Sequence, residues 1–258
     1  MKKQRVKYFT ILVALAFILP LLYGCQGNKK KEAAEKKPEE IAQKAAVSDS
    51  EWISLFDGKT LNGWKQYGQE QITNMWTAED GMIVCNGEGG DEADGRQRGS
   101  LMTTDQFGNF ELKLEWKISP EGNSGILYHV VEKPEYKHAF DTGPEYQLID
   151  DAGFPSPITE LQKTAAAYDM YPAKKDKKLN PAGEWNISRI VYNNGHVEHW
   201  LNGEKVLEYE EGSDDWKARY EKSKWVDYPG WNKYKEGAIA LQDHGSKVWF
   251  RNIRIKKL

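Results

Sequence analysis

The most regular pattern in the chain is the alternation of apolar and charged residues from Phe110 to Ile118, which reads Phe-Glu-Leu-Lys-Leu-Glu-Trp-Lys-Ile. A period of two over this length predicts a β-strand with one buried face and one solvated face. Shorter runs rich in apolar residues predict further strands at 126–131, 145–149, 187–193, 196–201, 204–209, 237–242 and 247–256.

Turn residues separate these runs. Asn194-Gly195 and Asn202-Gly203 stand between consecutive predicted strands, and Asn-Gly is a strong hairpin signal because both residues accept a positive φ. Two segments have a helical pattern, 157–163 and 213–224, and Ser213 is a candidate N-cap for the second. Many short strands, Asn and Gly turns and one or two short helices predict an all-β fold, an antiparallel β-sandwich or jelly roll.

The N-terminus has a different composition. A basic segment, 1–7, precedes an apolar run, 8–23, that is interrupted by Pro20 and followed by Gly24-Cys25. A charged start, a short apolar run and a small residue before a cysteine predict a lipoprotein signal peptide over residues 1–24, with Cys25 acylated as the new N-terminus. An uncleaved anchor helix is the alternative. Both predict an exported protein attached to a membrane, and we favour the periplasm over the cell surface.

Residues 25–50 are rich in Lys, Glu, Ala and Gln and contain almost no core-forming side chains, which predicts a solvated tether. We therefore expect a single folded domain over residues 51–258. Its mixed charges, with a formal net charge of −3 for the chain, give no basic face and argue against a nucleic-acid partner. With Cys25 acylated, Cys85 has no disulfide partner, so the core alone must stabilise the domain.

Seven motifs follow one another across residues 51–258. They are Leu55-Phe-Asp-Gly-Lys-Thr-Leu-Asn-Gly-Trp64, Gly122-Asn-Ser-Gly-Ile126, Gly143-Pro-Glu-Tyr-Gln-Leu-Ile-Asp150, Pro181-Ala-Gly-Glu-Trp-Asn186, His199-Trp-Leu-Asn-Gly203, Ile239-Ala-Leu-Gln-Asp-His-Gly245 and Val248-Trp-Phe-Arg-Asn-Ile253. In this order they resemble the 3-keto-disaccharide hydrolase family, also described as 3-keto-glycoside lyase/hydratase proteins. The resemblance implies a concanavalin A-like jelly roll, often on bacterial lipoproteins, that acts on sugars oxidised at C3. His129 stands where members commonly carry Arg, which leaves the preferred sugar or leaving group open.

An ordinary glycosidase needs two carboxylates that flank the scissile bond. In the predicted strand 145–149, Glu145 shares a face with Gln147, whereas Asp150 falls on the opposite face. Without a bulge, Glu145 and Asp150 cannot act on the same sugar. The sequence therefore does not support the ordinary retaining mechanism, which we keep as a lesser alternative.

A ketone at C3 changes these requirements because it makes the proton on C2 acidic. One base, an electrophile for the C3 oxygen and a proton donor for the leaving group are then sufficient for elimination at C1, and hydration completes a net hydrolysis. We predict Glu145 and His244 as the acid/base groups, with His199 beside them. Candidates for binding the substrate or orienting these groups are Gln147, Asp150, His129, Tyr128, Asp243 and Arg251.

Two further questions stay open at this stage. A carboxylate with two or three histidines could hold a divalent cation as the electrophile, although no short His spacing supports a metal site. The loop 86–94, rich in Gly, Glu and Asp, is expected at the rim of the site, with calcium binding as the alternative. Carbohydrate is the expected partner in either case. A non-catalytic carbohydrate-binding module is the main alternative function, because the fold and the aromatic content, 12% with ten Trp, suit it as well.

Overall fold

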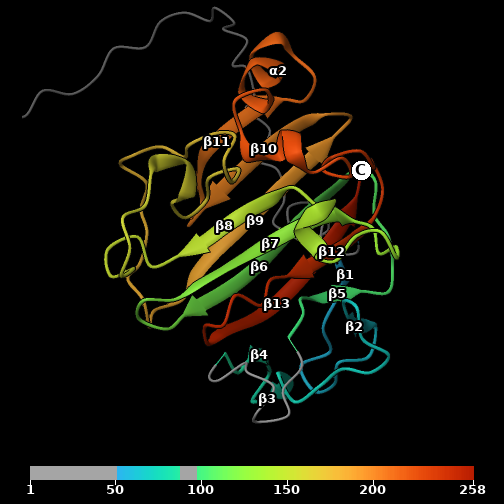
Figure 1. Ribbon diagram of the computed structural model, residues 1–258. Coiled ribbons are helices and arrows are strands. Elements are labelled where there is room, and N and C mark those ends of the chain that lie inside the picture. The colour runs from blue at the N-terminus through green and yellow to red at the C-terminus, as the bar shows by residue number, and fades with distance from the viewer. Residues whose placement is uncertain (1–50, 88–97) are drawn as a thin grey trace, which may run out of the picture. The chain divides into compact units, whose positions relative to one another are not determined.

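The structure is a computed structural model of the 258-residue chain, and it describes residues 51–87 and 98–258 (Figure 1). The predicted signal peptide, Cys25 and the tether lie outside the described residues, as does most of the loop 86–94. Within the part of the chain that the structure describes, no helix has the length and apolar character needed to cross a membrane.

The described residues form two antiparallel sheets (Figure 1). The larger sheet has the strand order β11-β10-β9-β6-β13-β4-β3, with β1 paired to β13, and the smaller sheet has the order β2-β5-β12-β7-β8. The predicted antiparallel β-sandwich of jelly-roll type is confirmed. The strands are β1 (Ile53–Ser54), β2 (Trp64–Gln66), β3 (Trp76–Glu79), β4 (Met82–Cys85), β5 (Leu101–Thr103), β6 (Phe110–Ile118), β7 (Asn123–Val130), β8 (Glu145–Ile149), β9 (Asn186–Asn193), β10 (His196–Leu201), β11 (Glu204–Glu210), β12 (Ala238–Leu241) and β13 (Val248–Lys257).

The helical segments are few and short. The predicted helix at 213–224 is α2 (Asp214–Tyr220), and the Oγ of its N-cap Ser213 accepts a hydrogen bond from the amide of Trp216 at 3.2 Å. The 3₁₀ turn η4 (Lys224–Asp227) follows it. The weaker prediction at 157–163 is wrong in type, because that stretch contains only the 3₁₀ turn η3 (Glu160–Gln162). A further turn, η2 (Ala139–Asp141), lies between β7 and β8.

The main core fills the space between the sheets. The alternating residues of β6 supply Leu112, Leu114 and Trp116 from the larger sheet, and all three are buried. Tyr146 and Leu148 of β8 meet them from the smaller sheet. Burial of these large apolar side chains is the dominant stabilising term of such a sandwich.

The other face of the smaller sheet carries a second, smaller buried cluster. Strand pairing aligns Met102, Ala240, Leu127 and Glu145 in one row across β5, β12, β7 and β8. Directly paired residues project to the same face of a sheet, so Glu145 ends a row of apolar side chains. Its neighbour Tyr146 projects to the opposite face, into the main core. The full cluster is Tyr67, Met102, Leu127, Val130, Ala139, Ala238 and Ala240.

Candidate active site

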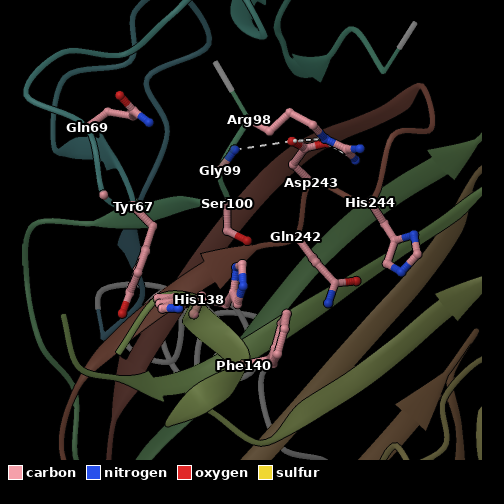
Figure 2. Close-up of a pocket in the computed structure, with 13 residues that line it drawn as sticks. Tyr67, Gln69, Arg98, Gly99, Ser100, His138, Phe140, Gln242, Asp243 and His244 are labelled. Atoms are coloured by element: carbon pink, nitrogen blue, oxygen red, sulfur yellow. Dashed lines mark hydrogen bonds and ion pairs between the residues drawn. The ribbon is translucent and has the colours of Figure 1, made fainter. Parts of the chain in front are cut away.

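A cavity of about 560 Å³ lies on this second face of the smaller sheet (Figure 2). Its volume is in the range of small-molecule binding sites. A second cavity of about 580 Å³ shares four of its lining residues with the first, so the two adjoin. The shared residues are Tyr67, Gly68, Gln69 and Lys137.

One wall of the cavity is held by the carboxylate of Asp243, whose side chain is only 1% exposed. It accepts hydrogen bonds from the backbone amides of Gly99 at 3.2 Å and Gly245 at 2.9 Å. The guanidinium of Arg98 adds two contacts at 3.3 Å, which are drawn as dashed lines in Figure 2. Asp243 therefore joins the segment after β12 to the segment before β5, and this places the adjacent His244 in the cavity wall.

The opposite wall is built from the segment between β7 and β8. Thr142 Oγ1 accepts a hydrogen bond from the amide of Val131 at 3.0 Å, which closes this segment into a loop. Asp141 Oδ2 accepts from the amide of His138 at 3.0 Å. As a result the rings of His138 and Phe140 stack with centroids 4.8 Å apart, and both line the cavity (Figure 2).

Glu145 is buried beside this cavity, with 6% of its surface exposed. The absent side chain of Gly125 on the paired strand leaves room for its carboxylate, because a Cβ there would lie 2.3 Å from Oε1. Burial raises the pKa of Glu145 to about 7, although the charge of Lys224 and a hydrogen bond from the Gln242 side chain act in the lowering direction. A carboxyl group whose pKa is near neutral is suited to proton transfer.

Gln242 connects Glu145 to the cavity. Its side chain hydrogen-bonds Glu145 and also lines the cavity. The oxygen of the amide, Oε1, is buried and has no hydrogen-bond partner among the described residues. Gln242, Asp243 and His244 are consecutive residues, so one short segment places an amide, a wall-forming carboxylate and an imidazole around the same space (Figure 2).

His199 does not join this group. It lies on β10 with the core-facing residues Val197 and Leu201, and it is fully buried between the sheets. Its Nδ1 donates to the carbonyl of Ala165 at 2.9 Å, and burial lowers its pKa to about 4. The expectation that His199 lies beside Glu145 and His244 is therefore wrong, because the alternation of β10 directs its ring into the core.

Two other candidates also belong to the core. Tyr128 is fully buried, and its hydroxyl lies 3.0 Å from that of Tyr209. His129 is fully buried as well and donates from Nε2 to the carbonyl of Gly108 at 2.9 Å. Neither residue lines the cavity, so the structure gives no support to their predicted contact with substrate.

The remaining candidates have structural partners. Asp150 binds the turns around it, since its Oδ2 accepts from the amide of Glu121 at 3.0 Å. Arg251 donates from Nε to Glu115 at 2.8 Å on the larger sheet. Gln147 is buried on β8, on the same face as Glu145 but outside the cavity lining. Of the nine predicted catalytic and substrate-binding residues, the structure brings Glu145, Asp243 and His244 to the cavity region.

The cavity also contains residues that the sequence did not reveal. His138, Phe140 and Tyr67 line it, and all three come from segments with no periodic pattern. In the sequence, His138 stands only a few residues before Gly143-Pro144-Glu145. That spacing alone does not predict that its ring lies near Glu145 in the folded protein.

The divalent-cation alternative can be compared with the described residues. Among them, the group of three potential ligands whose atoms lie within 4.8 Å of one another is His196, Glu198 and Glu208. This group lies on β10 and β11, outside the cavity lining, and Lys205 already pairs with both glutamates. These residues are therefore occupied with one another and are not placed to polarise a substrate bound in the cavity.

Comparison with known proteins agrees with the motifs. Residues 51–256 match the family described as the 3-keto-alpha-glucoside-1,2-lyase-like domain. The chain belongs to this family. A protein from Bacteroides thetaiotaomicron named 3-keto-disaccharide hydrolase is 36% identical over 92% of this chain and 94% of that protein. The predicted family membership is thus confirmed.

Solved structures show the same fold for this 3-keto-alpha-glucoside-1,2-lyase-like domain. A candidate glycosyl hydrolase from Parabacteroides distasonis is similar with a TM-score of 0.74 and 42% sequence identity, covering 86% of this chain and 98% of that one. A second candidate glycosyl hydrolase from the same organism has a TM-score of 0.62 and 27% identity, covering 80% of this chain and 99% of that one. The sandwich is therefore shared across the length of these proteins.

Proposed function

We propose that this protein cleaves 3-keto-glycosides, with 3-keto-disaccharides as the substrate class, and that Glu145 is the base that removes the C2 proton. The observation that carries the proposal is a buried carboxyl group with a pKa of about 7 at the edge of a cavity that also contains His244. Family membership and the name of the Bacteroides relative support the oxidised sugar as substrate.

The proposed reaction has two stages. Glu145 takes the proton from C2, the electron pair forms the enolate of the C3 ketone, and the C1–oxygen bond then breaks. His244 donates a proton to the departing oxygen. Water adds to the resulting enone, with its hydroxyl at C1 and a proton at C2, so that the sum of the two stages is hydrolysis. If the enone leaves before water adds, the same site acts as a lyase.

The dimensions of the site support a substrate of two sugar units. The cavity of about 560 Å³ would hold the oxidised ring near Glu145, and the adjoining cavity of about 580 Å³ would hold the leaving group. Tyr67, which borders both, offers an aromatic ring at the junction, where the apolar face of a sugar can pack.

An ordinary glycosidase mechanism is less well supported. Asp243 is the carboxylate among the described residues that line the first cavity, and Arg98 and two backbone amides already bind it. A retaining glycosidase needs a second carboxylate that is free to act as acid or nucleophile. The arrangement here favours a mechanism with a single base.

We also propose that the enzyme is exported and anchored by an acyl group on Cys25, facing the periplasm. The basic segment, apolar run and Gly24-Cys25 support this location. The tether over residues 25–50 would let the catalytic domain reach soluble oligosaccharides near the membrane.

The test uses the purified full-length protein with a 3-keto-glucoside in deuterated buffer. We expect deuterium incorporation at C2 and release of the leaving group, with kcat/KM falling as the pH drops below about 7, because the base must be ionised. Glu145→Gln should lower kcat by about 10²- to 10⁴-fold. Saturable binding without exchange or cleavage would instead support a carbohydrate-binding module, and cleavage of the unoxidised glycoside would support an ordinary glycosidase.

A further inference from the structure

Lys224 lies next to the candidate active site and comes from a part of the chain far from its other residues in sequence. It is the first residue of η4, and its backbone amide donates to Asp169 Oδ2 at 2.7 Å. The following residue, Trp225, is fully buried and donates from Nε1 to the carbonyl of Tyr168 at 2.9 Å. These two hydrogen bonds fix η4 against residues 168 and 169, which follow β8 in the chain. Glu145 is the first residue of β8.

The ammonium group of Lys224 is surrounded by aromatic rings. Its Nζ lies 4.3 Å from the ring centroid of Tyr168, 4.4 Å from that of Trp225 and 6.0 Å from that of Phe140. Ring faces attract a cation without neutralising it. Among the described residues, no carboxylate lies within ion-pair distance of this Nζ. The side chain is also accessible to solvent. Its charge therefore remains available to a ligand.

The charge of Lys224 also acts on Glu145. It acts to lower the pKa of Glu145 against the larger effect of burial. The pKa of Lys224 is itself lowered by partial burial, and the charges of Glu145 and Asp169 act in the raising direction. Tyr168 also faces the pair, and its own pKa is raised chiefly by burial and also by Glu145. Phe140 connects the pair to the cavity, because its ring lies under Lys224 and also forms part of the cavity wall.

We propose that Lys224 is a catalytic residue whose ammonium group stabilises the negative charge on the C3 oxygen of the substrate. This inference rests on the function proposed above. When Glu145 removes the C2 proton, the electron pair of the C–H bond moves toward the C3 oxygen and forms an enolate. A cation held close to the base meets this charge as it develops, which is the general means by which enzymes stabilise oxyanions. The enolate then re-forms the ketone as the C1–oxygen bond breaks, and Lys224 forms no bond to the sugar and keeps its protons throughout.

The aromatic surroundings suit this role better than a salt bridge would. A carboxylate partner would cancel the positive charge before substrate binds. The rings of Tyr168 and Trp225 hold the ammonium in place at little cost to its field, because they carry no net charge. Preorganised charge of this kind needs no rearrangement during the reaction.

The test compares Lys224→Met, which keeps an unbranched apolar side chain and removes the charge, with Lys222→Met as the matched control at an exposed lysine of the same segment. With a 3-keto-glucoside, we expect Lys224→Met to lower kcat and the rate of C2 deuterium exchange by about 10²- to 10³-fold. The acid limb of its pH–rate profile should also move to higher pH, because Glu145 loses the cation that lowers its pKa. Lys222→Met should match the unmodified enzyme in both respects.

A third variant and a mass measurement keep the test decisive if Lys224→Met is poorly folded. Lys224→Arg preserves the charge and should leave the acid limb in place, so a shift as large as that of Lys224→Met would overturn the proposal. An adduct on Lys224 after treatment with 3-keto-glucose and cyanoborohydride, absent in Lys224→Met, would also overturn it by indicating a covalent imine. Full activity and an unchanged pH profile in Lys224→Met would remove Lys224 while leaving the proposed function intact. Absence of exchange and cleavage in the unmodified enzyme would remove both.

Discussion

The ring of His199 packs against the ring of Tyr146 with centroids 4.6 Å apart. Tyr146 follows Glu145 directly in β8, and consecutive residues of a strand project to opposite faces. The contact therefore fixes His199 on the core side of the smaller sheet, while Glu145 faces the cavity side. Glu145 and His199, which each stand in a family-like motif, thus lie on opposite sides of the sheet.

This separation predicts that His199 is a structural residue. Replacement of His199 by Phe removes the donor to the Ala165 carbonyl and should destabilise the fold by about 1–3 kcal/mol, the cost of leaving a buried polar group unpaired. We expect kcat/KM for a 3-keto-glucoside to stay within about threefold of the unmodified enzyme. Urea unfolding measures the change in stability, and steady-state kinetics measure the change in kcat/KM. A large loss of kcat in well-folded His199→Phe would show that His199 takes part in the reaction.

Glu145 and His199 should also have opposing effects on the pH dependence of stability. The pKa of Glu145 is raised from 4.5 to about 7. The free energy of unfolding therefore falls by about 3 kcal/mol as the pH rises through that window, at 1.36 kcal/mol per pKa unit. The pKa of His199 is lowered from 6.5 to about 4, so the free energy of unfolding falls by a similar amount as the pH drops through that window. The two slopes nearly cancel between about pH 4.5 and 6.5.

Glu145→Gln should expose this balance. The variant cannot ionise at position 145. Its free energy of unfolding, relative to that of the unmodified protein, should therefore increase by about 3 kcal/mol between pH 4.5 and pH 8. It should also lose stability steadily on acidification below pH 6.5, since the His199 contribution is no longer offset. Chemical denaturation at several pH values gives both quantities. A stability difference between the two proteins that is the same at pH 4.5 and pH 8 would mean that Glu145 titrates normally.

Much of the fold could be predicted from the sequence because long strands have a visible period. The alternation of β6 and the Asn-Gly turns around β10 correspond to the observed elements. Strands β1 to β5 have two to four residues each, too few to establish a period, and they were missed. The position of His199 was available from the same alternation, since it falls in phase with Val197 and Leu201.

The candidate site was less accessible from sequence. Glu145 and His244 stand in family-like motifs, and both lie at or beside the cavity. His138 and Lys224 come from irregular segments whose positions depend on tertiary hydrogen bonds, such as that from the His138 amide to Asp141 and that from the Lys224 amide to Asp169. No local pattern encodes such contacts, so these residues could be found only in the folded molecule.

The room left by Gly125 provides a sharp steric test of the base. Gly125→Ala would place a Cβ 2.3 Å from the Oε1 atom of Glu145, so the carboxylate must shift. We expect kcat to fall at least about tenfold, since small displacements of a catalytic group are costly. Gly108→Ala is the control, because its Cβ would make only an ordinary contact, 3.6 Å from the Lys235 carbonyl. Equal kinetics in both variants would show that the carboxylate position does not matter.

Asp243 should act through the shape of the cavity. Asp243→Asn removes the charge that Arg98 and the Gly99 and Gly245 amides share, which should destabilise the protein by about 1–3 kcal/mol. We expect KM to rise more than kcat falls, because the wall carrying His244 loosens. Asp105→Asn, at an exposed carboxylate, should change neither stability nor kinetics. A selective loss of kcat in Asp243→Asn would instead indicate a direct part in the reaction.

The row that ends at Glu145 has a consequence for how such an enzyme could adapt. Leu127 pairs directly with Glu145 and places hydrocarbon beside the carboxylate, and it does not line the cavity. A polar substitution at Leu127 would hydrate the acid and move its working range toward lower pH with every reacting group unchanged. Relatives living in more acidic or more alkaline surroundings could thus diverge at this one position while keeping the same chemistry.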